Sequence, residues 1–363
     1  MKAVILAGGS GTRLWPVSRK NTPKQVQPFI DNDTLLQKTY KRIKKNFLDE
    51  DIFISANIKQ YPLIKNQLFH FPEENFILEP EKKETAAAIG LSAVKLYKKD
   101  PQSIMVTVNS DAYIKNEEEY LRILSLAEKV VKEHPEQTVL IGINPTYPET
   151  GYGYIKMAAP AFRYPKEGGG YDEVFEVEKF VEKPNLETAQ KYVSSWQYLW
   201  NPAVFVWNVE TLLKLYSDFL PEIYEILMRI YHSLDREGEI NVIKEQFAKI
   251  KPISIDYGIM EKIKKMLVIP ADFGWADIGS WRAVKDVLSA EKQNIIKGKF
   301  LGFESDNNLI YEYSKNKLVA AIGLKNFVVI DTEDALLICP EDKAQDVKNI
   351  VAKLKEEGKE EYL

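Results

Sequence analysis

The sequence predicts an α/β protein with a mixed, mainly parallel sheet, followed by a small β-rich domain. Strand-like and helix-like segments alternate up to about residue 143, which is typical of parallel strands connected by helices. The first apolar run, residues 3–7, ends at clustered glycines, which indicates a strand that stops at a sharp turn. From about residue 294 the pattern changes to short, closely spaced β-rich pieces, which indicates a second domain.

The alternating part begins with the strand over residues 3–7. Residues 32–34 offer a cap for a helix, because apolar side chains then recur at helical spacing from Leu35 to Phe47. The β-branched run over residues 103–108 is typical of a buried parallel strand. The other elements predicted here are strands over residues 52–56, 75–78 and 138–142, and helices over residues 84–98 and 117–133.

The rest of the sequence is interpreted as the end of this domain and a small appendage. Residues 151–290 mix strands and helices, and the glycines at 168–170 indicate a loop or hairpin tip over residues 166–170. We therefore predict a catalytic domain at residues 1–290 and a β-rich domain with a terminal helix at residues 291–363. The predicted elements of the second domain are strands over residues 309–311, 318–322, 327–330 and 335–339, and a charged helix over residues 343–357.

The composition argues against several classes of protein function. Of the 363 residues, 45% are hydrophobic and 28% are charged, which is ordinary for a soluble globular protein. A net charge of −4 without a long basic block argues against binding to nucleic acid or to anionic membranes. The single cysteine, Cys339, excludes an intrachain disulfide, and no apolar run suits a secretory signal or a membrane span. We therefore expect a cytoplasmic enzyme.

Residues 8–24, called the signature segment below, have the composition of a phosphate-binding turn. Gly8, Gly9 and Gly11 follow the first strand directly. Glycine lets backbone N–H groups approach a phosphate chain, because it has no Cβ and reaches positive φ. Two cations, Arg13 and Lys24, follow close behind, which indicates a polyanionic ligand. The segment therefore predicts a nucleotide-phosphate site.

Two well-known phosphate loops do not fit the spacing of this segment. A P-loop needs Lys and then Ser or Thr directly after its last glycine, whereas Thr12-Arg13 follows Gly11. The dinucleotide-binding fingerprint needs glycine or alanine where Leu14 stands, and an acidic residue at the end of the next strand. That strand, predicted over residues 52–56, ends without an acid. The signature segment is therefore a different kind of turn.

Two aspartates are candidates for holding Mg²⁺. Asp111 comes just after the buried strand 103–108, at the sheet edge where ligands of α/β proteins bind. Asp277 lies between glycine and tryptophan residues ahead of a helix predicted to begin near Ser280. Mg²⁺ is usually held by one or two carboxylates together with substrate phosphates. Each aspartate also has a structural alternative, a turn cap for Asp111 and a helix N-cap for Asp277, and Asp272 is a weaker candidate for the ion.

The ordered residues of the signature segment resemble the sugar-nucleotide pyrophosphorylase family, in which two glycines, a further glycine, Thr-Arg-Leu, a proline and Pro-Lys occur in this order. Residues 180–184, Phe-Val-Glu-Lys-Pro, resemble a second motif of that family. The chain resembles in particular its mannose-1-phosphate guanylyltransferase branch, the GDP-mannose pyrophosphorylases, in their short form. The stretches that carry this closer resemblance are residues 13–19, 254–262 and 274–281.

The resemblance implies a Rossmann-like nucleotidyltransferase domain that transfers GMP from GTP to α-D-mannose 1-phosphate, giving GDP-mannose and pyrophosphate. It implies that the catalytic residues are Arg13, Lys24, Asp111 and Asp277, with Mg²⁺ as the cofactor on the two aspartates. The implied sugar-phosphate-binding residues are Gly153, Glu182, Lys183 and Asn201. The implied nucleotide-binding residues are Leu6, Ala7, Gly8, Gly9, Gly11, Thr12, Arg13, Lys24, Thr85 and Ser110. We also expect a homodimer, formed through the β-rich domain.

The expected chemistry needs no general base. The second pKa of a phosphate monoester is about 6, so a sugar 1-phosphate is already an anion at neutral pH. Its oxygen would attack the α-phosphorus of the nucleoside triphosphate in line, and such a transfer depends mainly on positioning and charge stabilisation. The three histidines, His70, His134 and His232, all lie outside the motifs, as this chemistry allows.

Three departures from the family pattern leave open which nucleotide base the enzyme uses. Ala112 stands where the family usually has histidine, and Pro202-Ala203 replaces a Ser-Gly-like pair. Residues 83–87, expected near the nucleotide, read Lys-Glu-Thr-Ala-Ala where Arg-Asn-Thr-Ala-Pro is usual. The alternative enzyme is another sugar-1-phosphate nucleotidyltransferase, using dTTP or UTP. The alternative of a different class is a non-catalytic relative that binds a sugar nucleotide and regulates a partner.

Overall fold

The computed structural model describes residues 1–9, 11–166, 168–288, 293–314 and 317–363, which form two compact units. Unit 1 consists of Met1–Gly8, Tyr40–Asn109 and Ile114–Trp275, and unit 2 of Gly9–Thr39, Ser110–Tyr113 and Ala276–Leu363. The signature segment therefore belongs to unit 2, apart from its first glycine. Three features predicted above lie wholly or partly outside the described residues: Ser10 of the signature segment, Glu167 in the predicted hairpin tip and the predicted domain border at 290/291.

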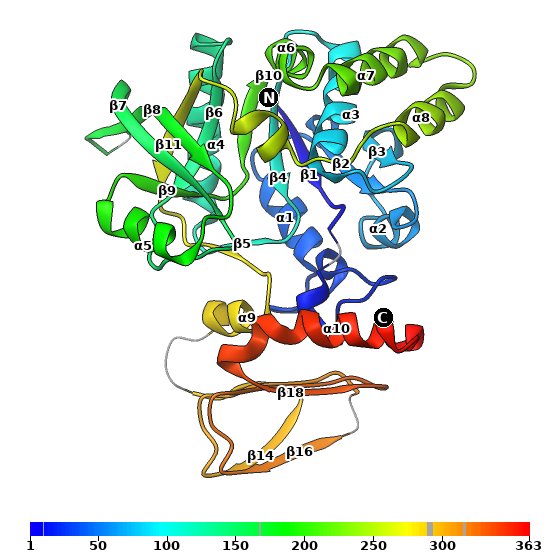
Figure 1. Ribbon diagram of the computed structural model, residues 1–363, viewed down its shortest axis with the longest axis vertical. Coiled ribbons are helices and arrows are strands. Elements are labelled where there is room, and N and C mark those ends of the chain that lie inside the picture. Colours follow the sequence, from blue (N-terminus) through cyan, green and yellow to red (C-terminus); the bar gives the residue numbers. More distant parts are fainter. Residues whose placement is uncertain (10, 167, 289–292, 315–316) are drawn as a thin grey trace. The chain divides into compact units, whose positions relative to one another are not determined.

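Unit 1 is built on a 10-stranded sheet, in the order β11-β8-β7-β9-β6-β10-β4-β1-β2-β3 (Figure 1). The strands predicted for the first 143 residues are confirmed. The strand bounds are β1 Lys2–Leu6, β2 Ile52–Asn57, β3 Phe76–Glu79, β4 Ile104–Asn109, β6 Thr138–Ile143, β7 Gly153–Pro165, β8 Tyr171–Val181, β9 Tyr198–Asn201, β10 Phe205–Asn208 and β11 Met266–Ala271.

Strands β3, β2, β1 and β4 are neighbours and run parallel. In the register of β1, Leu6 lies opposite Ser55 of β2 on one side and Asn109 of β4 on the other. Asn57 of β2 lies opposite Glu79 of β3. The carboxyl ends of these strands therefore share one edge of the sheet, where ligands of open α/β sheets bind.

The other part of the sheet is largely antiparallel. Strand β10 runs antiparallel to both β4 and β6, and β7 and β8 form a long antiparallel hairpin, whereas β11 runs parallel to β6. The sheet is therefore mixed, as predicted, but it is not mainly parallel, because antiparallel pairings outnumber the parallel ones. The alternation of strands and helices identifies the parallel run, because parallel strands need long crossovers, while antiparallel neighbours can be joined by short turns.

Helices α3, α6, α7 and α8 pack with the sheet in one continuous core. Trp207, Tyr216 and Phe247 are among its largest fully buried side chains. The helix bounds of unit 1 are α2 Tyr61–Gln67, α3 Glu84–Lys99, α4 Glu117–Glu133, α5 Leu186–Ser195, α6 Val209–Phe219, α7 Pro221–Ser233 and α8 Glu239–Ala248. Among the helices in the described ranges, none combines the length and the apolarity that a bilayer crossing requires.

Unit 2 contains the β-rich part of the chain. Strands β13, β15, β17 and β18 form a four-stranded sheet, and β14 and β16 form a parallel pair. The bounds are β13 Ile295–Lys297, β14 Lys299–Phe303, β15 Leu309–Glu312, β16 Leu318–Ile322, β17 Phe327–Asp331, β18 Leu336–Pro340, α9 Trp281–Leu288 and α10 Val347–Glu356. Each β-rich piece that the sequence predicted is thus confirmed as a strand.

The core of unit 2 joins residues from both ends of the sequence. Leu14 and Phe29 belong to the same buried cluster as Trp281 and Tyr311. The rings of Phe29 and Trp281 meet edge to face, with 5.4 Å between their centroids. The hydroxyl of Tyr311 donates a hydrogen bond to the carbonyl oxygen of Phe29, at 2.7 Å. The residues that follow the signature segment therefore pack against the β-rich part of the chain.

The predicted helix cap at residues 32–34 is confirmed. Helix α1 spans Leu35–Ile43, and Thr34 Oγ1 accepts a hydrogen bond from the N–H of Gln37, at 3.2 Å. The Gln37 side chain accepts in return from the N–H of Thr34, at 3.0 Å. This reciprocal pair is a capping box, which satisfies two N–H groups at the start of the helix.

Candidate active site

Lys24 lies between the two aspartates predicted to hold a metal ion, and all three residues belong to unit 2. Lys24 Nζ is 2.8 Å from Asp111 Oδ2 and 3.4 Å from Asp277 Oδ1. Burial by itself lowers the pKa of Lys24, but the charges of Asp111 and Asp277 outweigh it, so this pKa lies above its ordinary value. Lys24 is therefore a permanent cation beside two carboxylates.

Short backbone elements hold these three residues in place. Lys24 begins a 3-10 turn, Lys24–Val26, directly after Pro23. Asp111 precedes strand β5 (Ala112–Ile114), and Asp277 ends strand β12 (Trp275–Asp277). Because β5 and β12 pair with each other, aspartates from distant parts of the sequence can reach one lysine.

The geometry bears on two alternatives: the helix N-cap role of Asp277, and Asp272 as a ligand of the ion. Ser280 Oγ accepts from the N–H of Ala283 at the start of α9, at 3.4 Å, whereas the carboxylate of Asp277 faces Lys24. Asp272 belongs to unit 1, where its side chain accepts from the N–H of Gly274, at 3.4 Å.

Arg13 completes the set of predicted catalytic residues in unit 2. It lies in the 3-10 turn Thr12–Leu14 and donates a hydrogen bond to Gln345 Oε1, at 3.0 Å. A Cβ built on Gly279 would lie 3.5 Å from Arg13 Nη2 and 2.8 Å from Asp277 Oδ2. The positive charge of Arg13 also acts on Lys24 and lowers its pKa somewhat. We call Arg13, Lys24, Asp111 and Asp277 the phosphate cluster.

Gly11 is required by the conformation of the signature segment. Its φ is +62°, in the left-handed region that favours glycine. A Cβ at this position would also lie 2.5 Å from the Cβ of Lys24. A larger residue would therefore displace Lys24 from the two aspartates. This steric requirement applies to Gly11, whereas a Cβ on Gly8 or Gly9 would meet its nearest neighbour at 3.7 or 3.8 Å, an ordinary contact.

The other predicted nucleotide-binding residues fall in both units. Leu6, Ala7, Gly8 and Thr85 belong to unit 1, and Gly9, Gly11, Thr12 and Ser110 belong to unit 2. The hydroxyl oxygen of Thr85 accepts a hydrogen bond from the N–H of Ile255, at 2.8 Å. Thr85 therefore ties the start of α3 to the segment that precedes Asp256.

Glu79 is a site residue that the sequence analysis missed. It ends strand β3, is 6% exposed and accepts a hydrogen bond from Ser55 Oγ, at 3.1 Å. A Cβ built on Gly8 would lie 3.7 Å from its Oε1. Burial raises the pKa of Glu79 to about 7, against a smaller lowering by the Ser55 bond. The criterion that singled out Asp111, an acid at the end of a buried parallel strand, also applies to this residue.

Four residues predicted to bind the sugar phosphate come together in unit 1. Gly153 of β7 lies opposite Asn201 of β9, and a Cβ on Gly153 would lie 2.5 Å from Glu182 Oε2. Glu182 Oε1 forms an ion pair with Lys183 Nζ, at 2.9 Å. In the described part of the chain, Oε2 of Glu182 is buried without a hydrogen-bond partner. A buried acceptor of this kind indicates a missing donor, such as a hydroxyl group of a ligand.

Asp256 is a fifth member of this group, and the sequence analysis did not single it out. Its Oδ1 accepts a hydrogen bond from Asn201 Nδ2, at 3.3 Å. Burial, and secondly the charge of Glu182, raise the pKa of Asp256 to about 6. Perturbed carboxyl groups in a cluster are typical of functional sites. We call Gly153, Glu182, Lys183, Asn201 and Asp256 the sugar cluster.

Two non-glycine residues beside the sugar cluster have left-handed backbones. Lys183 has φ 47° and Ala203 has φ 55°. Asn201 Oδ1 accepts from the N–H of Ala203, at 2.9 Å, and so holds this turn. Backbone strain of this kind costs energy and persists where the surrounding structure demands it. Ala203 stands at the second place of the pair that is Ser-Gly-like in the family, so glycine would relieve the strain there.

The fold and the two clusters define a nucleotidyltransferase. Residues 2–294 match the family model described as "Nucleotidyl transferase". Residues 298–354 match the model described as "MannoseP isomerase/GMP-like beta-helix domain". The predicted fold class, an α/β nucleotidyltransferase domain with a β-rich C-terminal domain, is thereby confirmed.

Similar proteins show to which family of nucleotidyltransferases the chain belongs. "Mannose-1-phosphate guanylyltransferase 2" of Escherichia coli O157:H7 is 35% identical over 99% of this chain and 75% of its own length. "Alginate biosynthesis protein AlgA" of Pseudomonas aeruginosa is 34% identical over 99% of this chain and 73% of its own length. A crystal structure described as a "mannose-1-phosphate geranyltransferase" from Thermus thermophilus is 30% identical, with a TM-score of 0.85 over 98% of this chain and 99% of that one. The chain belongs to the mannose-1-phosphate guanylyltransferase family, as the resemblance of residues 13–19, 254–262 and 274–281 predicted.

Proposed function

We propose that this chain transfers GMP from GTP to α-D-mannose 1-phosphate and releases GDP-mannose and pyrophosphate. The observation that carries the proposal is the contact of Lys24 with Asp111 and Asp277 in the unit that holds most of the signature segment. A buried cation shared by two carboxylates suits a site that binds phosphates through both basic residues and a metal ion. The names of the relatives supply the particular nucleotide and sugar.

We propose Mg²⁺ as the cofactor, held by Asp111 and Asp277. Both carboxylates contact one atom, Lys24 Nζ, so both can also reach one ion. Within the described ranges, no group of three or more His, Cys, Asp or Glu side chains could hold a metal. This fits an ion that takes its other ligands from phosphates and water. When bound, Mg²⁺ would neutralise and orient the triphosphate.

The cations of the phosphate cluster stabilise charge during the transfer. Lys24 stays protonated because its pKa is raised, and it can turn from the aspartates to the phosphates of GTP. Arg13 supplies a second, planar set of donors that suits phosphate oxygens. The backbone N–H groups around Gly9 and Gly11 bind the phosphate chain. These residues neutralise the transferred and the leaving groups, and no proton transfer is needed.

The sugar cluster binds mannose 1-phosphate. The buried Oε2 of Glu182 accepts a hydrogen bond from a sugar hydroxyl, and Asp256 offers a second acceptor. The side chain of Lys183 is 55% exposed, so its ammonium group is accessible to a phosphate. Burial lowers the pKa of Lys183, but its bond to Glu182 outweighs this and keeps the pKa above its ordinary value. Lys183 therefore pairs with the sugar phosphate as a cation.

Glu79 supports guanine as the base. A carboxylate can accept two hydrogen bonds from guanine, one from N1–H and one from the amino group at C2, whereas uracil and thymine present one N–H between two carbonyl oxygens. Glu79 lies next to Gly8, at the carboxyl end of the parallel strands. A GTP preference that weakens in Glu79→Gln would support this role, and an unchanged preference would contradict it.

We also propose a cytoplasmic homodimer, joined through the β-rich part. Large apolar side chains are exposed on four of its strands: Ile296 on β13, Leu301 and Phe303 on β14, Leu318 and Ile322 on β16, and Leu336 and Ile338 on β18. Contiguous exposed apolar surface is typical of an interaction site. The cytoplasm supplies GTP, the proposed donor.

A product assay tests the proposal. The purified chain is mixed with Mg²⁺ and each of GTP, ATP, UTP and dTTP, crossed with mannose, glucose and fucose 1-phosphates, and pyrophosphate and sugar nucleotide are measured. We expect GDP-mannose as the main product, and loss of turnover in Asp277→Asn and on removal of the metal by a chelator. Product with another base alone, or full turnover in Asp277→Asn, contradicts the proposal. An inactive chain that still binds GDP-mannose would support the regulatory alternative.

A further inference from the structure

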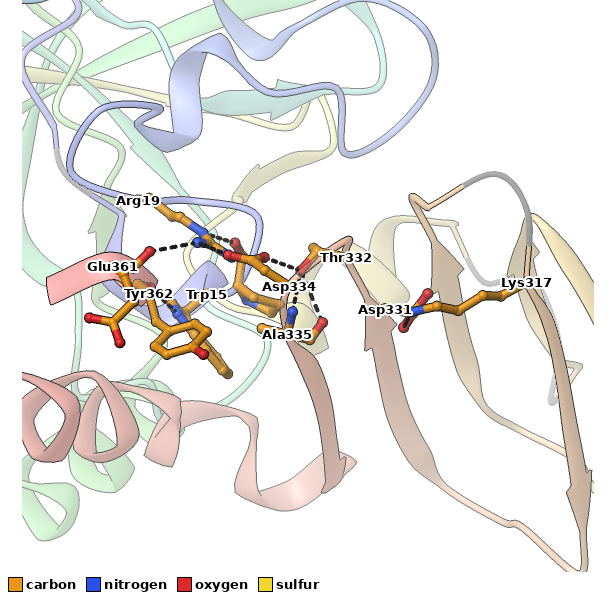
Figure 2. Close-up of polar contacts among 10 residues, drawn as sticks. Trp15, Arg19, Lys317, Asp331, Thr332, Asp334, Ala335, Glu361 and Tyr362 are labelled. Atoms are coloured by element: carbon orange, nitrogen blue, oxygen red, sulfur yellow. Dashed lines mark hydrogen bonds and ion pairs between the residues drawn. The ribbon is translucent and has the colours of Figure 1, made fainter. Parts of the chain in front are cut away.

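Residues 360–363 contact the signature segment of unit 2, although they lie at the far end of the sequence. The indole Nε1–H of Trp15 donates a hydrogen bond to the carbonyl oxygen of Tyr362, at 2.8 Å, as Figure 2 shows. Arg19 donates a longer one, at 3.5 Å, to the carbonyl oxygen of Glu361. Both acceptors are backbone atoms, so the contact depends on the path of residues 360–363 and not on their side chains.

A turn after helix α10 sets this path. The helix ends at Glu356, and Gly358 adopts φ +69°, the left-handed conformation in which many helices end. The N–H of Lys359 bonds back to the carbonyl oxygen of Leu354, at 2.9 Å, which is the long bond of a Schellman motif. The turn directs the 3-10 turn Glu360–Tyr362 toward Trp15.

Trp15 is held at both its side chain and its backbone. Its side chain is buried, with the residue 8% exposed, and a buried indole N–H needs an acceptor, which Tyr362 supplies. Its own carbonyl oxygen accepts from Trp281 Nε1, at 2.9 Å. The 3-10 turn that carries Arg13 ends at Leu14, directly before Trp15, and Trp281 begins the helix after Asp277. Trp15 therefore connects the turn of Arg13 with the segment of Asp277.

Arg19 holds the next part of the signature segment independently. Its two terminal nitrogens bond both carboxylate oxygens of Asp334, at 2.7 and 2.6 Å (Figure 2). Its Nε bonds the carbonyl oxygen of Pro16, at 2.8 Å. The bidentate pair is a strong one. Removal of residues 360–363 leaves this ion pair intact. The removal would therefore disturb only the orientation of Trp15 and of the 3-10 turn that precedes it.

We propose that residues 360–363 are a positioning segment for nucleotidyl transfer, because they hold Trp15 and thereby orient Arg13 within the phosphate cluster. The inference rests on the proposed function. Glu360 and Glu361 are exposed, and Tyr362 and Leu363 are half-buried. Tyr362 packs against the buried core cluster of unit 2. An unfolding measurement therefore separates an effect of the segment on orientation from an effect on folding.

The test compares the unaltered chain with two variants: deletion of residues 360–363, and Trp15→Phe, which keeps a ring but removes the N–H donor. We expect kcat to fall about 10- to 100-fold in both, because displacements near 1 Å cost about that much. The KM for mannose 1-phosphate should stay within about twofold, because these variants remove no group that binds the sugar. The matched control is Glu361→Ala, which keeps its backbone carbonyl and should keep full kcat.

Two further measurements test the inference: kcat of a variant that combines the deletion with Trp15→Phe, and the unfolding temperature of each variant. If both changes break the same hydrogen bond, the combined variant loses no more kcat than either one alone. Full kcat after the deletion, losses that multiply in the combined variant, or a loss that follows a lower unfolding temperature would each overturn the inference. An unaltered chain that forms no sugar nucleotide overturns the proposed function instead, and is recognised because every variant is then equally inactive.

Discussion

Gly153 offers a sharp test of the sugar cluster, because a single methyl group would disturb it. A Cβ at this position would lie 2.5 Å from Glu182 Oε2 and 3.2 Å from the Cβ of Asn201. Non-bonded atoms attract best at about 3.5–4.0 Å, so the Glu182 carboxylate must move by about 1 Å in Gly153→Ala. The backbone of Gly153 is not left-handed, so alanine adds no conformational strain there.

We expect kcat/KM for mannose 1-phosphate to fall about 100-fold in Gly153→Ala, because a displacement of about 1 Å at a positioning group costs about that much. The affinity for GTP, measured by calorimetry without sugar phosphate, should stay the same, because none of the predicted nucleotide-binding residues belongs to the sugar cluster. The assay is steady-state release of pyrophosphate at fixed GTP.

Gly151→Ala is the matched control, because Gly151 lies two residues before Gly153. A Cβ on Gly151 would lie 3.1 Å from Oε1 of the half-buried Glu149, which accepts a hydrogen bond from the N–H of Gly151, at 2.8 Å. Glu149 is not part of the sugar cluster, so a shift of its flexible side chain leaves Glu182 in place. We expect a change of no more than about twofold in this control. Unchanged kcat/KM in Gly153→Ala, or equal losses in both variants, would refute the role given to Glu182.

Three further predictions concern other parts of the site. Arg13→Ala should lower kcat by about 10³–10⁵, by analogy with arginine fingers, and a loss below about tenfold in single-turnover transfer would contradict its catalytic role. Burial raises the pKa of Asp256 to about 6, above the ordinary 3.8, so the folded state holds this proton more tightly and the free energy of unfolding falls as pH rises from about 4 to about 6. In Asp256→Asn that fall, measured by urea unfolding at about pH 4.5 and about pH 7.5, should be smaller by about 1–3 kcal/mol, and an unchanged fall would show that Asp256 is not the group that titrates. Ala203→Gly should raise the free energy of unfolding by about 0.5–1 kcal/mol, because relief of a left-handed alanine exceeds the added entropy of the unfolded chain, and a lower midpoint in urea would argue against strain at this turn.

The parallel half of the sheet could be predicted from the sequence because each strand there is a short apolar run followed by a helix. The antiparallel half was harder to predict. Strands β9 (Tyr198–Asn201) and β10 (Phe205–Asn208) have only four residues each and are separated by three, so neither hydrophobic periodicity nor a crossover helix marks them. Their pairing with β6 depends on contacts with residues distant in the sequence.

Some residues of the candidate site could likewise be predicted from the sequence, and others could not. Gly11, Arg13 and Lys24 could be proposed together because they follow one strand within one segment. Glu79 directly follows a predicted strand and could have been proposed by the criterion that singled out Asp111. Asp256 could not be separated from ordinary surface acids, because burial distinguishes it, and burial is a property of the folded chain.

By itself, the sequence determined which reactive groups this protein has: clustered glycines beside two cations, an aspartate after a predicted strand, a second aspartate ahead of a predicted helix, and a Glu-Lys pair that suits a sugar phosphate. Only the tertiary structure decided which of these groups touch. In the folded chain both aspartates contact Lys24, and Asp256 accepts a hydrogen bond from Asn201. The backbone carbonyl oxygen of Tyr362 accepts a hydrogen bond from the indole of Trp15. The physical reason is that hydrogen bonds and ion pairs act over a few ångströms, whereas spacing along the chain says nothing about distance once strands and loops fold back on one another.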